Sequence, residues 1–253
     1  MMKSANALFR PLLTTVALAL LLAVPAAAQR MQPQDRSARD VAGAFDYYTL
    51  VLSWSPTYCA SQPSNDSDPQ CRLNSPRPYA FVLHGLWPQY ENGFPEYCRT
   101  RERPFVPRRT IDNMLDIMPS PRLVIHEYRK HGTCSGLDPV GYYDLSRKLF
   151  EKIKIPERFV APEKPFFVTP GEVADAFLKA NPDLDNDMLA VECRGSGNRL
   201  REIRICFSRE GNFRACGSNE HPRRLCSAGR MYVPPVRGGG ASILPGPRGQ
   251  RSL

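Results

Sequence analysis

Eight cysteines constrain the fold of this chain more than any other feature of its sequence. They are spread from Cys59 to Cys226, and no two of them have the C-x-x-C spacing that is typical of zinc sites and thioredoxin-like redox sites. In an exported protein, an even number of cysteines indicates disulfides, and eight cysteines allow 105 pairings. The sequence therefore predicts a domain that is held together by four disulfides, provided that the chain leaves the cytosol.

The N-terminal segment indicates export. Lys3 and Arg10 supply positive charge, Leu12–Val24 is apolar, and Ala26–Ala28 offers the small residues typical of a cleavage site. The apolar stretch is shorter than the roughly 20 residues that cross a bilayer as a helix. We therefore expect residues 1–28 to be a cleaved signal peptide, and the mature protein to be periplasmic or extracellular without a membrane span.

The rest of the chain divides into three parts. Residues 29–44 are polar and predict a flexible leader, whereas residues 234–253 predict a disordered basic tail that is rich in proline and glycine. Residues 45–233 contain no linker and no repeat, which predicts a single domain. The net charge of +9 suggests a polyanionic partner, but residues 45–233 hold 26 Lys and Arg against 23 Asp and Glu. Charge alone therefore does not choose among nucleic acid, lipid and glycan.

Hydrophobic patterns predict strands at both ends of this domain and helices between them. The expected strands are 47–54, 79–83, 188–192 and 199–208, and the expected helices are 110–118, 122–130, 140–153 and 170–178. Thr169 and Glu172 form a capping box at the start of the last helix. A turn signal at 210–212 would fold the chain back and bring Cys216 beside Cys206. This order favours an α+β fold with a largely antiparallel sheet.

Three of the four histidines lie in two short segments. The first segment is FVLHGLWPQ, with His84 at the end of an expected strand and Trp87 in an exposed turn. The second is HEYRKHGTC, which contains His126 and His131. A zinc-binding helix needs histidines at positions i and i+4, whereas these two are five apart and would lie about 140° apart around a helix. The sequence therefore argues against a metallohydrolase.

Two histidines without a metal suit the cleavage of RNA, which carries its own nucleophile in the 2′-OH beside each phosphate. The reaction needs one group that removes the 2′-OH proton, another that protonates the leaving oxygen, and positive charge near the phosphate. An imidazole serves either proton-transfer role because its ordinary pKa is near 6.5. Lys130 is the obvious cation, Glu127 would orient a histidine or share a proton, and Trp87 would stack on a base.

The same two segments resemble the signature segments of the ribonuclease T2 family of secreted endoribonucleases. The strand that leads into Trp54 and Cys59 resembles the opening strand of that family, and the resemblance extends over Phe45–Tyr232. It implies a ribonuclease T2-like fold in which helices flank the sheet. It also implies cleavage of single-stranded RNA, with broad base tolerance and without metal or cofactor, to a 2′,3′-cyclic phosphate and then a 3′-phosphate.

The resemblance also implies a role for each matching residue. His131 would be the general base and His84 the general acid, while Glu127 and Lys130 would stabilise the transition state. His126 would bind phosphate, and Trp87 would belong to the base site, which completes the set of expected site residues.

For the cysteines, the resemblance implies the pairs Cys98–Cys134 and Cys193–Cys226 beside Cys206–Cys216, which leaves Cys59–Cys71. Tyr128 stands where many members have tryptophan.

One alternative is an exported protein that binds RNA or other polyanions without cleaving them. Such a relative would be expected to have lost His84, His131 or Lys130, and all three are present. We therefore expect an active monomeric enzyme that acts on RNA and does not cleave DNA, which lacks the 2′-OH.

Overall fold

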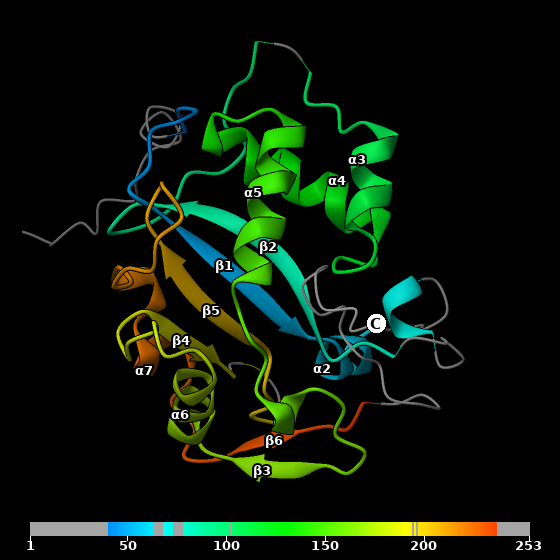
Figure 1. The fold of residues 1–253 in the computed structure, drawn as a ribbon, viewed down its shortest axis with the longest axis vertical. Coiled ribbons are helices and arrows are strands. Elements are labelled where there is room, and N and C mark those ends of the chain that lie inside the picture. The colour runs from blue at the N-terminus through cyan, green and yellow to red at the C-terminus, as the bar shows by residue number, and fades with distance from the viewer. Residues whose placement is uncertain are drawn as a thin grey trace, which may run out of the picture. The chain divides into compact units, whose positions relative to one another are not determined.

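The computed structural model describes residues 40–62, 68–72, 78–101, 103–193, 195 and 197–236. These residues belong to one compact unit, residues 33–253 (Figure 1). The predicted signal peptide, most of the predicted leader and most of the predicted tail lie outside the described residues. None of the helices in the described ranges has the length and apolar character that crossing a membrane requires.

Strands and helices have the following bounds. The strands are β1 (Tyr47–Trp54), β2 (Phe81–Gln89), β3 (Phe166–Val168), β4 (Leu189–Glu192), β5 (Glu202–Phe207) and β6 (Met231–Val233). The α-helices are α2 (Ser55–Ala60), α3 (Arg108–Met114), α4 (Pro121–Lys130), α5 (Pro139–Glu151), α6 (Pro170–Ala180) and α7 (Pro222–Leu225). Short 3-10 helices are η1 (Pro69–Cys71), η2 (Gly132–Ser135), η3 (Glu157–Phe159) and η4 (Ser218–Glu220).

The main sheet is antiparallel throughout, with the strand order β2-β1-β5-β4 (Figure 1). This confirms the predicted α+β fold with an antiparallel sheet. A second sheet, formed by β3 and β6, was not predicted. Its strands have three residues each, which is too short for a hydrophobic alternation to be recognised.

The two faces of β1 point to different parts of the protein. Leu50, Leu52 and Trp54 are fully buried and point into the hydrophobic core. Helix α5 crosses this face in Figure 1, and the hydroxyl of its buried Tyr142 donates a hydrogen bond to the carbonyl of Leu86 at 2.8 Å. The opposite face of the sheet is therefore left for the polar residues of the candidate site.

Strand β2 is longer than the sequence predicted, because a β-bulge interrupts its alternation. Leu83 and Gly85 pair with consecutive residues of β1, so His84 between them is the extra residue of the bulge. The prediction that a strand ends at Leu83 was wrong, as was the exposed turn at Trp87, which is half-buried within β2. Pro88 is tolerated because β2 is an edge strand.

The predicted helices are all present, with some differences in their bounds. Helix α3 ends at Met114 rather than at residue 118, because the following turn brings the carbonyl of Ile117 to the backbone N–H of Leu83 at 2.8 Å. The capping box that begins α6 is confirmed: Thr169 Oγ1 accepts a hydrogen bond from the N–H of Glu172 at 3.1 Å, and Glu172 Oε2 accepts one from the N–H of Thr169 at 2.7 Å.

Four disulfides join all eight cysteines in the expected pairs: Cys59–Cys71, Cys98–Cys134, Cys193–Cys226 and Cys206–Cys216. Cys134 is the last residue of the second histidine segment, and its bridge to Cys98 joins the β2–α3 connection to η2. Residues beside the predicted domain boundaries also contact the core, since the N–H of Gly43 donates to Cys134 and that of Val236 donates to Pro162, both at 2.9 Å.

Candidate active site

The β-bulge places His84 between two carboxylates. Its Nδ1 lies 2.9 Å from Oε1 of Glu202 on β5, and its Nε2 lies 3.6 Å from Oε1 of Glu127 on α4. Burial disfavours the charged imidazolium, but the hydrogen bond to Glu202 and the negative charges of Glu127 and Glu202 outweigh it. The pKa of His84 is therefore raised above its ordinary value, and the side chain remains 31% exposed.

Glu127 is buried and makes close contact with β2. Its Oε2 accepts a hydrogen bond from Nε1 of Trp87 at 2.7 Å. Burial raises the pKa of this carboxyl, and the neighbouring charge of His84 offsets only part of the rise. The approach depends on Gly85, because a Cβ atom there would lie 2.1 Å from Oε2 of Glu127.

His131 follows the last residue of α4, and its N–H donates a hydrogen bond to the carbonyl of Glu127 at 2.8 Å. Its ring stacks on Trp87 with 4.9 Å between ring centroids and an angle of 22° between the planes. Burial, together with the positive charge of Lys130, lowers the pKa of His131 to about 2. This imidazole is therefore neutral, and its buried Nδ1 has no hydrogen-bond partner among the described residues.

Lys130 and His126 lie at the solvent-facing side of the same helix. Lys130 Nζ is 3.7 Å from Oε2 of Glu96 and its side chain is 31% exposed. His126 is exposed, whereas His131 is buried, so the two imidazoles do not face a common ion. A positive charge on His126 would add to the lowering of the pKa of His131.

The structure thus gathers the expected residues other than the exposed His126 around one point of β2. His84 lies edge-on to Trp87, with ring centroids 5.2 Å apart, and His131 stacks on the same indole ring. Glu127 contacts both His84 and Trp87, while Lys130 precedes His131 in the chain.

A cavity of about 310 Å³ opens beside His131 and Lys130. Two further cations, Arg204 and Arg224, also line it, so the cavity suits an anionic ligand with an aromatic or polar part. The complete lining is Trp87, Gln89, Phe94, Lys130, His131, Arg204, Asn219, Arg224 and Leu225. A smaller cavity of about 60 Å³ reaches His84 and is lined by Ser53, Tyr58, Asp68, Gln70, Val82, His84, Ser120 and Leu123.

Glu202 and Arg204 were not among the predicted site residues. They alternate along β5 with the buried Ile203 and Ile205, a pattern that on its own indicates a solvent-facing side. Instead, Arg204 forms ion pairs with Glu192 and Glu202, and its guanidinium lies 5.2 Å from the centre of the Trp87 ring.

Burial would raise the pKa of Glu202, but the hydrogen bond with His84 and the charges of His84 and Arg204 hold it well below its ordinary value. Glu202 is therefore charged, and it faces the imidazole with a full negative charge.

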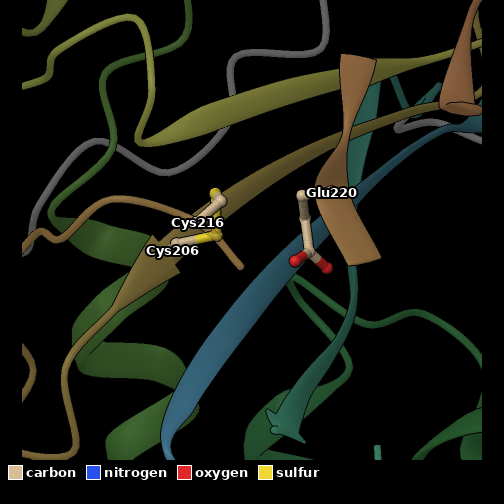
Figure 2. A group of neighbouring side chains, drawn as sticks. All are labelled: Cys206, Cys216 and Glu220. Atoms are coloured by element: carbon tan, nitrogen blue, oxygen red, sulfur yellow. A yellow bond between two sulfur atoms is a disulfide. The ribbon is translucent and has the colours of Figure 1, made fainter. Parts of the chain in front are cut away.

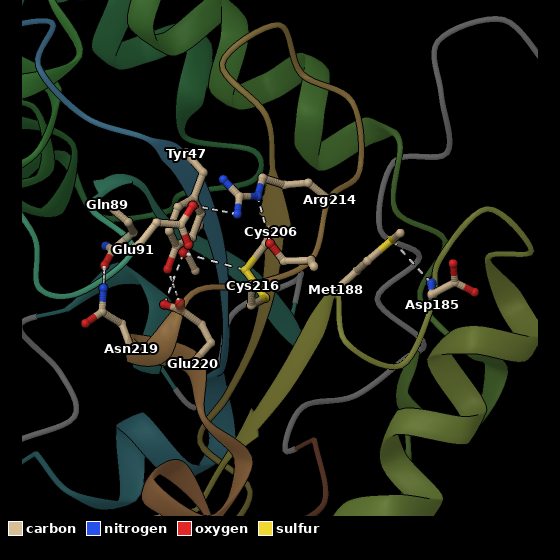
Figure 3. The surroundings of a disulfide bond; sticks show 12 residues. Tyr47, Gln89, Glu91, Asp185, Met188, Cys206, Arg214, Cys216, Asn219 and Glu220 are labelled. Carbon is tan, nitrogen blue, oxygen red and sulfur yellow. Dashed lines mark hydrogen bonds and ion pairs between the residues drawn. A yellow bond between two sulfur atoms is a disulfide. The ribbon is translucent and has the colours of Figure 1, made fainter.

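A second polar cluster lies near the other end of β5. Cys206, Cys216 and Glu220 place possible ligand atoms within 4.8 Å of one another (Figure 2). Both sulfur atoms are bonded to each other in a disulfide, so neither is a thiolate that could hold a metal. The carboxylate of Glu220 instead accepts hydrogen bonds from Tyr47 at 2.5 Å and from Thr49 at 3.1 Å (Figure 3).

Comparison with known proteins agrees with this geometry. The model of the ribonuclease T2 family matches residues 45–216. The chain belongs to the ribonuclease T2 family. A ribonuclease from Aeromonas hydrophila is 38% identical over 199 residues, which cover 76% of this chain and 86% of that protein. A probable ribonuclease from Haemophilus influenzae is 29% identical over 195 residues, which cover 73% of this chain and 65% of that protein.

Solved structures show the same fold. The structure of RNase NT in complex with 5′-AMP matches with a TM-score of 0.56 at 25% identity, covering 76% of this chain and 98% of that one. An RNase-related protein from Calystegia sepium matches with a TM-score of 0.58 at 20% identity over the same shares. The resemblance inferred from the two histidine segments is therefore confirmed, and this chain is a ribonuclease T2-type enzyme.

Proposed function

We propose that this ribonuclease T2-type enzyme cleaves single-stranded RNA without a metal ion, through attack of a 2′-OH on the adjacent phosphate. The products would be a 2′,3′-cyclic phosphate and a free 5′-OH, and slower hydrolysis would open the cyclic phosphate to a 3′-phosphate. The observation that carries the proposal is that both imidazoles contact Trp87, His84 edge-on and His131 by stacking, and that the pKa values of the two imidazoles are shifted in opposite directions.

The opposite pKa shifts assign one of the two proton transfers to each histidine. His131 is neutral and has a lone pair, so it takes the proton from the 2′-OH as the new P–O bond forms. His84 holds a proton because of its carboxylate neighbours, and it gives that proton to the 5′ oxygen as the old P–O bond breaks. When water then opens the cyclic phosphate, the two histidines exchange roles: His84 acts as the base and His131 as the acid.

Charge on the pentacoordinate phosphate needs its own stabilisation. Lys130 supplies a cation beside His131, and Glu127 shares a proton with the phosphoryl oxygens, since burial raises the pKa of its carboxyl. His126 is exposed on the same helix and binds a phosphate of the strand. A base enters the cavity that Trp87 lines, and because this cavity is walled partly by long side chains, we expect broad base tolerance.

The sequence also left open a function in binding RNA or other polyanions without cleavage, and the described residues offer no observation that favours it. The assembly of His84 and His131 on Trp87, with Lys130 next to His131 in the chain, supports catalysis instead. The four disulfides support an oxidising compartment, so we propose an exported monomer in the periplasm or outside the cell.

The first test compares three substrates in the presence of EDTA. The purified protein should cleave RNA to fragments with cyclic phosphate ends and should leave 2′-O-methyl RNA and DNA intact, because neither has a free 2′-OH. Loss of activity in the chelator, or equal cleavage of DNA, would contradict the proposal.

The second test removes each imidazole in turn. His84→Ala and His131→Ala should each lower the rate of RNA cleavage by 10² to 10⁴-fold, the usual contribution of a general acid or base, while RNA binding persists. The matched control is His221→Ala, since His221 is exposed and lies outside the site. Retained activity in either of the first two variants would overturn the assignment of that histidine.

A further inference from the structure

The positive charge of the folded part is concentrated in the connection between β2 and α3 and in the first two residues of α3. Residues 97–109, here called the arginine loop, contain five arginines and one glutamate, a net charge of +4. Residues 45–233 as a whole carry only +3, so the rest of this part of the chain has a net charge of −1. The net positive charge of this part of the chain therefore comes from the loop.

These arginines are available for a ligand. Arg99, Arg101 and Arg103 are exposed, and none of them forms an ion pair or hydrogen bond with a described residue. Arg108, by contrast, is paired with Asp112 at 2.9 Å. A row of unpaired guanidinium groups at alternate positions suits the regularly spaced phosphates of a nucleic-acid strand.

Aromatic side chains flank the three exposed arginines, with Tyr97 before them and Phe105 after them. Tyr97 is 56% exposed and Phe105 is 73% exposed, which is a large apolar surface to leave in water. Cationic groups beside open aromatic faces are the combination that binds single-stranded nucleic acid, since bases stack on the rings while arginines hold the phosphates. A duplex would bind only through the charges of the arginines, because its bases are already stacked on one another.

The loop is joined directly to α4 and to η2. The N–H of Tyr97 donates a hydrogen bond to the carbonyl of Lys130 at 2.8 Å, and Cys98 is bonded to Cys134. Tyr97 also has a φ of 51°, a left-handed conformation that is costly for a residue with a side chain and that these tethers hold in place. Figure 1 shows the chain between β2 and α3 as an arch. The loop begins shortly after Phe94, which lines the cavity.

We propose that the arginine loop is an additional binding surface for single-stranded RNA, which holds the part of the strand beyond the nucleotides that react. The inference rests on the proposed function, because it assigns a longer substrate to the same site. A strand leaving the cavity beside Lys130 meets the loop at Tyr97, so binding there would raise the affinity for long RNA without altering the chemical step.

The test compares a dinucleoside monophosphate, which is too short to reach the loop, with a single-stranded RNA of about 20 nucleotides. The variant Arg99→Gln/Arg101→Gln/Arg103→Gln should lower kcat/KM for the long RNA by about tenfold at low salt, mainly through KM. The slope of log kcat/KM against log salt concentration should become shallower by about 2, since each phosphate contact on a single strand contributes about 0.7. Cleavage of the dinucleoside should change by less than about twofold, because it does not depend on these contacts.

The matched control removes three positive charges elsewhere. Lys154, Lys164 and Lys179 are exposed residues outside the loop and the site, and Lys154→Gln/Lys164→Gln/Lys179→Gln should retain both activities. This control separates a local binding surface from a general effect of net charge.

Three outcomes would overturn the proposal. The arginine variant could cleave long RNA as well as the wild-type protein does, or it could lose activity on both substrates equally. Unchanged RNA cleavage together with lost binding to vesicles that contain anionic lipid would assign the loop to a membrane surface instead. Failure of the wild-type protein to cleave either RNA is a different result, because it would contradict the proposed function itself.

Discussion

Nδ1 of His84 lies 2.9 Å from Oε1 of Glu202, although the two residues are 118 positions apart in the chain. The contact reaches across β1. This strand lies between β2, which carries His84, and β5, which carries Glu202. A charged carboxylate on Nδ1 orients the ring and favours its protonated form, which leaves Nε2 directed toward Glu127. We therefore expect Glu202 to act as a positioning residue for the proposed general acid.

The first prediction concerns the pH dependence that this contact creates. A general acid whose pKa is raised is protonated below that pKa, so activity should be lost as pH rises through it. In Glu202→Gln the charged acceptor is gone and burial then lowers the pKa of His84. The alkaline limb of kcat/KM against pH should therefore move to lower pH by about one unit or more.

Glu192→Gln is the matched control for this experiment. It removes a carboxylate from the same cluster, but one that contacts Arg204 rather than His84. The alkaline limb of kcat/KM against pH should move less for Glu192→Gln than for Glu202→Gln. An NMR titration of the His84 ring gives a second measurement, and an unchanged pKa in Glu202→Gln would refute the positioning role.

The second prediction concerns the close approach of α4 to β2 at Gly85. A Cβ atom at this position would lie 2.1 Å from Oε2 of Glu127 and 2.5 Å from Nε1 of Trp87, so Gly85→Ala must separate these two groups. We expect kcat to fall about 10²-fold, as for a misplacement of about 1 Å, and the free energy of unfolding to fall by about 1–3 kcal/mol. Kinetics and urea unfolding measure the two effects.

Gly229→Ala provides the comparison, because a Cβ at Gly229 would meet no atom within 4 Å. It should leave both the kinetics and the stability close to those of the wild-type protein. Near-normal kcat in Gly85→Ala would show that the Glu127–Trp87 hydrogen bond is not needed for catalysis.

The sequence predicted most of the fold because local signals were strong. Strand β1 is rich in aromatic and β-branched residues, and Thr169 and Glu172 mark the start of α6 with a capping box that the structure contains. The second histidine segment likewise fell on a recognisable helix, α4. In each case the information lies within about ten consecutive residues.

The sequence failed where the structure depends on long-range pairing. Leu83 and Leu86 both point into the core, which is incompatible with simple alternation, and only the pairing with β1 reveals His84 as a bulge. Glu202 looked like a solvent-facing residue for the same reason: its neighbours on the sheet come from distant parts of the chain. The histidines could be identified from their motifs, but the carboxylate that tunes one of them could not.

The third prediction concerns the bridge that holds the arginine loop against η2. Replacing Cys98 and Cys134 with serine opens a bridge with a sequence separation of 36, which should lower the free energy of unfolding by about 2–4 kcal/mol. Because Cys134 lies three residues after His131, kcat should fall as well. The bridge Cys193–Cys226 has a similar separation of 33, so its removal should cost similar stability with a smaller effect on kcat. Thermal unfolding and steady-state kinetics distinguish the two variants, and equal loss of kcat in both would contradict the link to His131.

The fourth prediction concerns the buried carboxyl of Glu220. Burial raises its pKa, even though Tyr47 and Thr49 donate hydrogen bonds to it (Figure 3). A group with a raised pKa in the folded state contributes stability that is fully present below its unfolded pKa, about 4.3 for glutamate, and is lost as pH rises through the folded pKa. Glu220→Gln has no proton to release at this position, so it lacks this dependence.

The free energies of unfolding of the two proteins should therefore converge or cross as pH rises. The difference, wild type minus Glu220→Gln, should be most favourable to the wild type near pH 4 and should decrease toward pH 7, as urea unfolding at several pH values would measure. Glu163→Gln, which removes an exposed carboxylate from the loop before β3, controls for the change in net charge. A difference that stays constant or increases with pH would show that Glu220 is charged in the folded protein despite its burial, and that the hydrogen bonds from Tyr47 and Thr49 outweigh the cost of desolvation.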